Sequence, residues 1–174
     1  LFRSSVDMNV QDLGWRGSHG LKNLFASLAL FNPPAVSATL SLPSDCRLEH
    51  HIPDAYTMER RILPSCMVRV VDVQAALGMT RFPGSGSLII RVKDDILDWN
   101  DGRFLIQWSG GSTEASPTTR DPQLSLDVRT LAPLLVGFIG GPELIDHGLA
   151  ESTLSREQLA VVFPRKALYQ NNHF

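Results

Sequence analysis

A short glycine-containing motif is the first place where the residue types of this chain could do chemistry. Arg81-Phe-Pro-Gly84-Ser-Gly86 fits the pattern R-x-x-G-x-G, which binds a pyrophosphate when its glycines open a helix with free N–H groups. Here the glycines lead into Leu88–Val92, a pattern typical of a strand. A short motif outside its structural context carries little weight, so we interpret this stretch as a loop that binds no phosphate.

Two other stretches contain metal-ligand residue types without the spacing of a metal site. His50 and His51 are adjacent and have Asp54 nearby, but adjacent side chains point apart in most backbones. Asp98-Trp-Asn100-Asp101-Gly102 has the composition of a calcium loop, yet its glycine comes one position too early and no glutamate closes the loop. We therefore predict exposed histidines, a hairpin turn and no bound metal.

Two single residues invite a catalytic interpretation. Asp72 is a carboxylate inside an apolar run, and a buried carboxylate must be paired or hydrogen-bonded. We expect a structural pairing, with Arg69, Arg91 or a backbone N–H as partner, rather than a catalytic role. His147 is expected near a helix C-terminus, where a cation is favoured, so capping explains it.

The C-terminal residues allow two interpretations. The polar run Gln170-Asn-Asn-His173 is typical of a frayed terminus. The last residue, Phe174, is aromatic, which would suit docking into an apolar pocket.

Composition narrows the class of protein. The chain has 174 residues, 43% of them hydrophobic, and a net charge of −2, which argues against a nucleic-acid partner. No apolar run reaches the roughly 20 residues that span a bilayer, and no signal peptide is recognisable, so a cytoplasmic protein without a membrane partner is expected. Cys46 and Cys66 form no CxxC pair, which is typical of reduced thiols. The chain starts at Leu1, so an upstream part is expected.

Residue patterns in the first third predict the end of a larger α/β unit. From a cap at Ser18, leucine and phenylalanine recur with helical spacing, and Pro33-Pro34 stop the helix. Alternation over 36–42 then predicts a half-buried strand. Residues 43–65 have no clear period and are interpreted as a connection, with a domain boundary near Pro64.

The middle of the chain is expected to consist mainly of strands. Apolar residues run almost without interruption from Met67 to Val73, and alternation is clear in three later segments. The expected strands are Met67–Val73, Leu88–Val92, Phe104–Trp108 and Leu124–Val128. Asn100-Asp101-Gly102, between the second and third of these strands, is expected to form a hairpin turn, because these residues tolerate positive φ. The small, polar stretch 109–122 is interpreted as a mobile loop.

Three helices are expected at the end. An apolar stripe over 131–139 is ended by Gly140-Gly141, and a short helix covers 142–147 with Gly148 beyond it. A capping box of Ser155 and Gln158 opens the third helix, whose core face is Leu159, Val162 and Phe163. Strands followed by helices favour an α+β fold, with an antiparallel-rich sheet covered by the C-terminal helices.

Three runs together resemble a known family. Met67-Val-Arg-Val-Val-Asp-Val-Gln-Ala-Ala-Leu77, the strands around Asn100-Asp101-Gly102, and Gln123-Leu-Ser-Leu-Asp-Val-Arg-Thr-Leu-Ala-Pro-Leu134 are similar to segments of the Eis-type (enhanced intracellular survival) N-acetyltransferases of the GNAT superfamily. The resemblance implies that residues 1–63 are the second half of a central, cofactor-free GNAT-like domain. It implies that residues 64–174 are a sterol-carrier-like domain.

The resemblance also implies chemistry. Such enzymes transfer acetyl from acetyl-CoA to a primary amine, with aminoglycosides or lysine side chains as examples. The terminal carboxylate is the general base, a role that falls here on Phe174, and burial would have to raise its pKa from roughly 3.5. Acetyl-CoA and the general acid would belong to a GNAT domain upstream of this chain, which alone should be inactive. The alternative is that the chain is a degenerate relative of these enzymes and not a part of one. A further copy of the chain, in a homo-oligomer, is also left as a partner.

Two rival functions belong to other classes. A lipid-binding module of the sterol-carrier type would need a continuous apolar tunnel between sheet and helices. A non-catalytic scaffold for oligomer contacts would show an exposed apolar patch of several hundred Å², a size roughly at the upper end for monomers.

Overall fold

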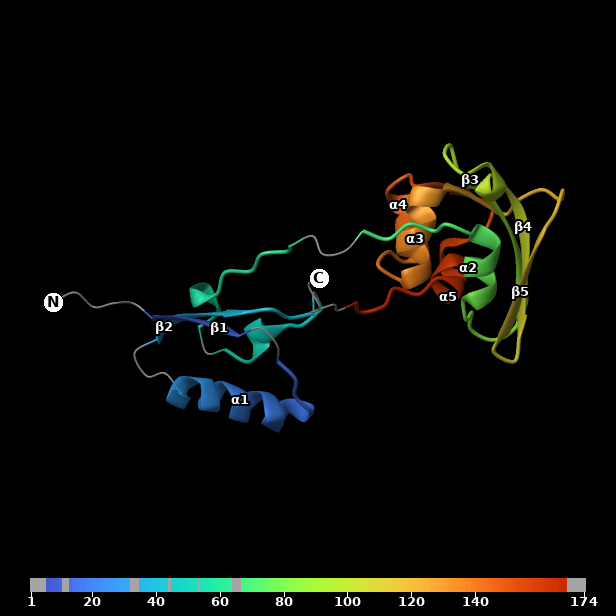
Figure 1. The fold of residues 1–174 in the computed structure, drawn as a ribbon. Helices are drawn as coiled ribbons and strands as arrows, with labels where there is room; N and C mark the ends of the chain where they lie inside the picture. Colours follow the sequence, from blue (N-terminus) through green and yellow to red (C-terminus); the bar gives the residue numbers. More distant parts are fainter. Residues whose placement is uncertain are drawn as a thin grey trace. The chain divides into compact units, whose positions relative to one another are not determined.

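The computed structural model describes residues 6–10, 13–31, 35–43, 45–52, 54–63 and 67–168. The chain divides into two compact units, one built from residues up to 65 and the other from residues 66 to 167 (Figure 1). Each unit has its own secondary structure, and the two are described separately below.

The first unit contains a parallel pair of strands joined by a helix. Strand β1 (Val6–Val10) pairs with β2 (Ala35–Leu40), and α1 (Gly17–Phe31) forms the crossover that a parallel pair requires. The predicted helix and strand are confirmed, although α1 begins one residue before Ser18, so that Ser18 lies inside the helix. Two 3₁₀ turns, η1 (Leu48–His50) and η2 (Ala55–Thr57), follow in the predicted connection.

The second unit is built on a five-stranded mixed sheet with the order β5-β4-β3-β6-β7. Its strands are β3 (Gly86–Lys93), β4 (Gly102–Ser109), β5 (Ser112–Pro117), β6 (Leu124–Asp127) and β7 (Ala150–Ser152). Only the pairing of β3 with β6 is parallel among these strands. The predicted strands around residues 90, 106 and 125 are confirmed, except that Val128 already belongs to the next helix.

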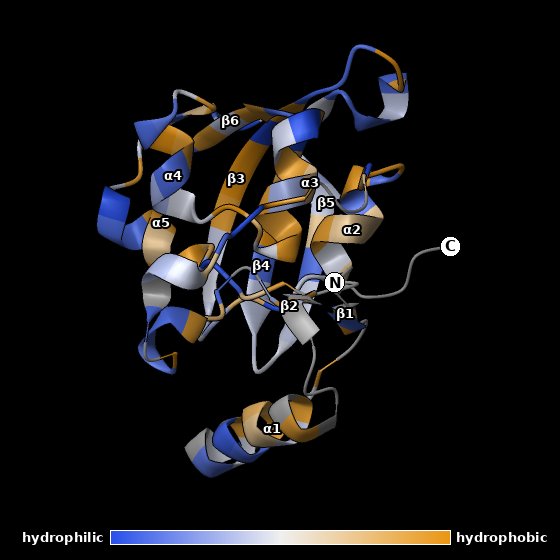
Figure 2. Ribbon diagram, turned by 90° about the vertical axis from the view of Figure 1, so that its left-hand side faces the viewer, coloured by the Kyte–Doolittle hydropathy of each residue, from blue (hydrophilic) through white to orange (hydrophobic). Residues whose placement is uncertain are grey.

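Helices lie on one face of this sheet (Figures 1 and 2). They are α2 (Val73–Met79), α3 (Val128–Val136), α4 (Gly141–Asp146) and α5 (Arg156–Val162). Alternate side chains of β3 and β4 point toward them and are buried, including Ile90 and Ile106, which are both 0% exposed. The α+β fold with an antiparallel-rich sheet covered by helices is therefore confirmed.

The strand predicted over Met67–Val73 is wrong. Residues 67–71 have no regular structure, and Asp72 caps α2 by accepting a hydrogen bond from Ala75 N at 2.9 Å. The run has the apolar composition of a buried strand, but the side chains of Met67 and Val71 are exposed. The cap and the helix-forming Ala-Ala-Leu that follows decide the local structure.

The mobile loop predicted over 109–122 is also wrong, because residues 112–117 form β5 at the edge of the sheet. Gly110 and Gly111 have φ of 60° and 82° and make the tight turn between β4 and β5. An edge strand exposes one side, so the small, polar side chains of β5 suit it.

The hairpin expected around Asn100-Asp101-Gly102 is confirmed, because β3 and β4 are consecutive antiparallel strands, but its connection is longer than these three residues. Residues 94–101 join β3 to β4 and contain the 3₁₀ turn η3 (Asp98–Asn100). Within the described part of the chain, only glycines have positive φ, so Asn100 does not act through the conformation assumed for it. Asn100 is instead 0% exposed and serves as a hydrogen-bonding centre.

The final helices differ from the prediction in one boundary. Helix α3 ends at Gly137, with φ of 85°, and Gly140-Gly141 open α4 instead of ending α3. Gly141 allows α4 to approach α5, since a Cβ there would lie 2.2 Å from the Leu159 carbonyl oxygen. The short helix before Gly148 and the capping box of Ser155 and Gln158 are confirmed.

Candidate functional site

An open groove of about 650 Å³ lies between α2 and α3 of the second unit. Four sets of residues line it: one face of α2 with the residues that follow it, one face of α3, the segment that leads into α2, and Lys166 from the segment after α5. The lining residues are Val68, Arg69, Val70, Val71, Asp72, Ala75, Ala76, Met79, Thr80, Arg81, Ala132, Leu135, Val136 and Lys166. We call this the α2 groove, and we call residues 67–72 the approach segment.

The approach segment is held by side chains of the β3–β4 connection. Asn100 accepts a hydrogen bond from Val73 N at 2.9 Å, and its Nδ2 lies 3.4 Å from the Val71 carbonyl oxygen. Trp99 Nε1 donates to the same carbonyl oxygen at 2.9 Å. These bonds give the backbone groups of Val71 and Val73 fixed hydrogen-bond partners, although the approach segment has no regular structure. Polar groups of the backbone need such partners where they are removed from water.

An ion pair between the half-exposed Arg69 and the buried Asp94 completes this attachment. Arg69 Nη2 lies 2.9 Å and 3.1 Å from the two carboxylate oxygens of Asp94, whose side chain is 0% exposed. Burial alone would raise the pKa of Asp94. Hydrogen bonds from Asn100, from two backbone N–H groups and from Arg69 outweigh it and lower the pKa to about 2. Asp94 is therefore charged across the neutral range and acts structurally.

The buried carboxylate of this region is not Asp72, for which burial was expected. Asp72 is exposed and caps α2, so its predicted structural pairing with a backbone N–H is confirmed. The buried carboxylate is Asp94, which was not predicted from the sequence. A signal existed, because Asp94 follows a strand directly and accepts from Ile96 N two residues on, the pattern of an Asx turn.

The R-x-x-G-x-G stretch does not open a helix. Gly84 has φ of 68°, and Gly86 begins β3, so the predicted strand context is confirmed. A Cβ on Gly86 would lie 2.6 Å from the Trp108 ring, which packs across β3 and donates Nε1–H to the Pro83 carbonyl oxygen at 2.9 Å. This glycine makes room for an indole ring, not for a phosphate.

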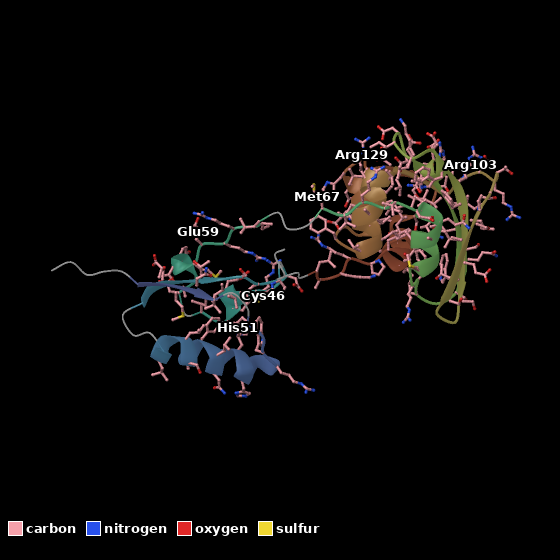
Figure 3. The ribbon with its side chains drawn as sticks, viewed as in Figure 1. Cys46, His51, Glu59, Met67, Arg103 and Arg129 are labelled. Carbon is pink, nitrogen blue, oxygen red and sulfur yellow. The ribbon has the colours of Figure 1, made fainter. Side chains whose placement is uncertain are left out.

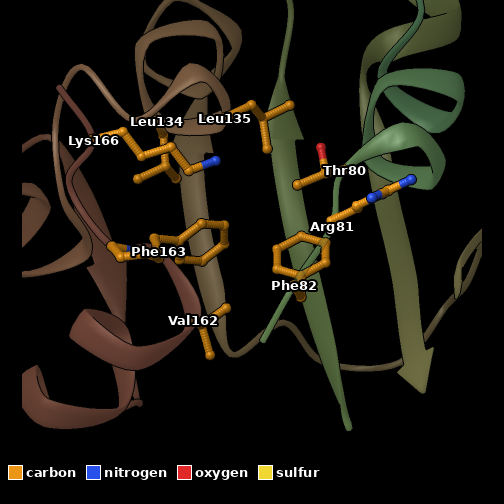
Figure 4. Close-up of a pocket in the computed structure, with 9 residues that line it drawn as sticks. Thr80, Arg81, Phe82, Leu134, Leu135, Val162, Phe163 and Lys166 are labelled. Carbon is orange, nitrogen blue, oxygen red and sulfur yellow. The ribbon is translucent and has the colours of Figure 1, made fainter. Parts of the chain in front are cut away.

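A small hollow adjoins the α2 groove at Thr80, Arg81, Leu135 and Lys166 (Figure 4). Phe82 and Phe163 also line it, with ring centroids 5.7 Å apart in an edge-to-face arrangement. Its volume of about 20 Å³ has room for about one water molecule. A hollow of this size between sheet and helices does not hold the acyl chain or sterol that the lipid-binding rival requires.

The remaining candidate residues do not come together. Among the residues that the structure describes, no three histidine, cysteine or acidic side chains are placed to hold a metal ion. Cys46 and His51 belong to the first unit (Figure 3), and Cys46 is a free thiol whose pKa is raised by partial burial and by Asp45. His147 caps the C-terminal end of α4, as expected. Cys66 and Phe174 lie outside the described residues.

Fold and site together define a class of protein: an α+β domain with helices on one face of a mixed sheet and an open apolar groove between two of them. None of the helices in the described ranges is long and apolar enough to cross a membrane. A family profile described as the sterol carrier protein domain matches residues 73–170. The chain belongs to this family.

Relatives of known sequence are named as acetyltransferases. A protein of Streptomyces avermitilis called an uncharacterized N-acetyltransferase is 30% identical over 108 residues, which are 62% of this chain and 26% of that protein. One of Streptomyces griseus with the same description is 36% identical over 86 residues, or 49% of this chain and 20% of that protein. The chain thus spans about a quarter or less of these relatives.

Solved structures share the fold. Eis1 from Mycobacterium abscessus aligns with a TM-score of 0.74 and 22% identity, over 98% of this chain and 44% of that chain. A GCN5-related N-acetyltransferase from Kribbella flavida aligns with a TM-score of 0.64 and 21% identity, over 95% and 43% of the two chains. At such low identity these structures establish the fold alone.

Proposed function

We propose that this chain is the C-terminal region of an acetyl-CoA-dependent N-acetyltransferase that acts on primary amines. One observation carries the proposal: relatives that match this chain are named N-acetyltransferases, and they are several times longer than the matched stretch. In this proposal a GNAT domain elsewhere in the same polypeptide binds acetyl-CoA. The sterol carrier domain shapes the cleft for the amine, which is a small molecule or a lysine side chain.

The chemical contribution proposed for this chain is the main-chain carboxylate of Phe174. An attacking ammonium must first lose a proton, and a carboxylate within hydrogen-bond reach can accept it. Support comes from the resemblance to the Eis-type family and from the start of the tail. After α5, Lys166 N donates to the Gly137 carbonyl oxygen at 2.9 Å, which fixes the backbone at Lys166.

A transfer assay on the full-length protein tests the proposed activity. The protein is mixed with acetyl-CoA and a panel of primary amines, and released coenzyme A is measured with a thiol reagent. We expect release that depends on the amine and yields the acetylated amine by mass spectrometry. Tertiary amines, which cannot form a stable amide, are the matched control. Acetyl-CoA binding without acetylation of any primary amine would contradict the proposal.

A further inference from the structure

The chain is held by the sterol carrier domain beyond its last helix. Phe163 directly follows α5, is 3% exposed and accepts a hydrogen bond from Gly141 N at 2.8 Å. Residues 164–168 are exposed, and exposed residues near the end of a chain usually fray unless they are tied down. This segment is tied down, because Lys166 N donates to the Gly137 carbonyl oxygen at 2.9 Å. Figure 4 shows the Phe163 and Lys166 side chains, which come from this part of the chain.

An ion pair adds a side-chain contact to these two backbone bonds. Arg165 Nη1 donates to Glu143 Oε1 at 2.8 Å. The other oxygen of that carboxylate, Oε2, accepts from Gly140 N at 2.7 Å, so Glu143 is itself held at the start of α4. Residues 163–166 thus contact the α3–α4 connection and the first turn of α4, residues 137–143. We call these contacts the tail clamp.

The turn that receives Lys166 is fixed by α3. Gly137 is the C-cap of this helix, with φ of 85°, and its N–H donates to the Leu134 carbonyl oxygen at 3.0 Å. Phe138 N donates to the Pro133 carbonyl oxygen at 2.8 Å, which completes the cap. A Cβ on Gly137 would lie 2.7 Å from Lys166 Cγ, so the absence of a side chain makes room for Lys166. The clamp therefore joins the exposed segment to a hydrogen-bonded helix end.

The clamp contributes little to the hydrophobic core. The side chains of Arg165 and Glu143 are 63% and 27% exposed, and exposed ion pairs contribute little to stability. Its main effect is on the residues that follow. The tail, residues 167–174, has eight residues, and each spans at most about 3.6 Å when fully extended. The terminal carboxylate of Phe174 must therefore lie within roughly 30 Å of Lys166.

We propose that the tail clamp positions the terminal carboxylate for its role as general base, so that Gly137, Glu143 and Arg165 are positioning residues. This inference rests on the proposed function, in which the carboxylate takes a proton from the ammonium group of the substrate. A general base must come within about 2.6–3.2 Å of the atom that gives up the proton. A displacement of about 1 Å can lower the rate ~10²-fold, so an anchor close to the end of the chain affects catalysis.

Gly137→Ala in the full-length protein is the first test. Alanine is strained at positive φ, and its Cβ would push the Lys166 side chain aside. We expect kcat to fall ~10-fold or more while KM for acetyl-CoA stays unchanged, because acetyl-CoA binds in another domain. Gly148→Ala is the matched control, since φ is 62° and a Cβ there would meet nothing within 4 Å. It imposes similar backbone strain outside the clamp, which thermal unfolding measures in both variants, and should retain kcat.

Added formate separates misplacement of the base from a loss of folding. Formate is a small carboxylate that can accept the proton when the terminal carboxylate is displaced. It should raise the kcat of Gly137→Ala by ~3-fold or more and leave the unmodified enzyme unchanged, with sodium chloride at equal ionic strength as the control. A kcat that formate does not raise would show that the substitution acts on folding, and would overturn the inference.

The ion pair is tested without any backbone strain. Arg165→Met and Glu143→Gln each remove it, and the glutamine can still accept from Gly140 N. Each should lower kcat by ~2- to 5-fold, the scale of an exposed ion pair. Both act on one contact, so the double variant should lose no more than either single variant. Losses that multiply in the double variant would contradict the role assigned to this pair.

The full-length enzyme with one alanine added after Phe174 separates failure of this inference from failure of the proposed function. The addition displaces the carboxylate and leaves the clamp intact. A kcat that falls on this addition but not in Gly137→Ala would refute the clamp and leave the general base in place. A kcat that is unchanged in both would refute the general base, and the inference with it.

Discussion

At the scale of single residues, Asp94 and Asn100 join two parts of the chain that have no regular pairing with each other. Arg69, within the approach segment, donates to Asp94, and the backbone N–H of Val73, directly after the segment, donates to Asn100. Their hydrogen bonds fix one wall of the α2 groove. Removing either side chain would leave buried partners unsatisfied, which is the costly outcome for polar groups in a core.

Asp94 gives the fold a defined sensitivity to acid. Its folded-state pKa of about 2 lies below the roughly 3.9 of an unfolded aspartate. The stabilisation is therefore fully present above pH ~4 and is lost as the pH falls toward ~2. Urea unfolding of Asp94→Asn across this range should show a large destabilisation at neutral pH that shrinks on acidification.

Asp121→Asn is the control for this series, because the Asp121 side chain is fully exposed and an ion pair at such a position contributes little to stability. A difference between the Asp94 variant and the unmodified chain that stays constant from neutral pH down to pH ~2 would contradict the assigned role of Asp94.

At the scale of elements, two helical glycines differ in how much room a side chain would have. A Cβ on Gly78 in α2 would meet only the Thr113 carbonyl oxygen, at 4.0 Å. Gly78→Ala should therefore stabilise the chain by about 0.5–1 kcal/mol, since alanine is the better helix former. A Cβ on Gly141 in α4 would lie 2.2 Å from the Leu159 carbonyl oxygen. Gly141→Ala should destabilise by about 1–3 kcal/mol, because α4 and α5 must separate.

Thermal unfolding of this matched pair measures both effects. Equal shifts in the same direction would show that helix propensity decides both positions and that α4 does not approach α5 as closely as described.

Local patterns predict some of these elements well and others poorly. The capping box of α5 and the alternation of β3 and β4 depend on neighbouring residues, so the sequence reveals them. Strand β5 was missed because its small, polar side chains fit an edge that exists only once β4 is in place. Helix α2 was missed because an apolar run has the same appearance in a buried strand and before a helix.

The candidate site found in the structure depends on tertiary contacts to a greater extent. Asn100 has the chemistry of a turn residue, and only the fold shows that its amide binds Val73 across 27 positions of sequence. The α2 groove combines residues from three separate segments, which no local pattern brings together. The interpretation of Gly84 and Gly86 could be made from sequence, since the strand after them excludes a helix-based phosphate site.

At the scale of the whole molecule, the chain is a sterol carrier domain joined to a smaller α/β unit. In the proposed enzyme, acetyl-CoA binds elsewhere in the polypeptide. We therefore expect calorimetry of this chain with acetyl-CoA to show no heat of binding, while the full-length protein binds it. Micromolar binding of acetyl-CoA to this chain alone would contradict the proposal that acetyl-CoA binds elsewhere in the polypeptide. It would also contradict the interpretation of the Arg81–Gly86 stretch as a loop that binds no phosphate.

The most direct measurement of the central claim is the kcat of the full-length enzyme with one alanine added after Phe174. The addition moves the terminal carboxylate away from its proposed position, so kcat should fall by ~10²-fold or more, the usual contribution of a general base. Phe174→Leu keeps the carboxylate in place and should retain most of the activity. An unchanged kcat for the extended enzyme would contradict the claim that this chain supplies the base.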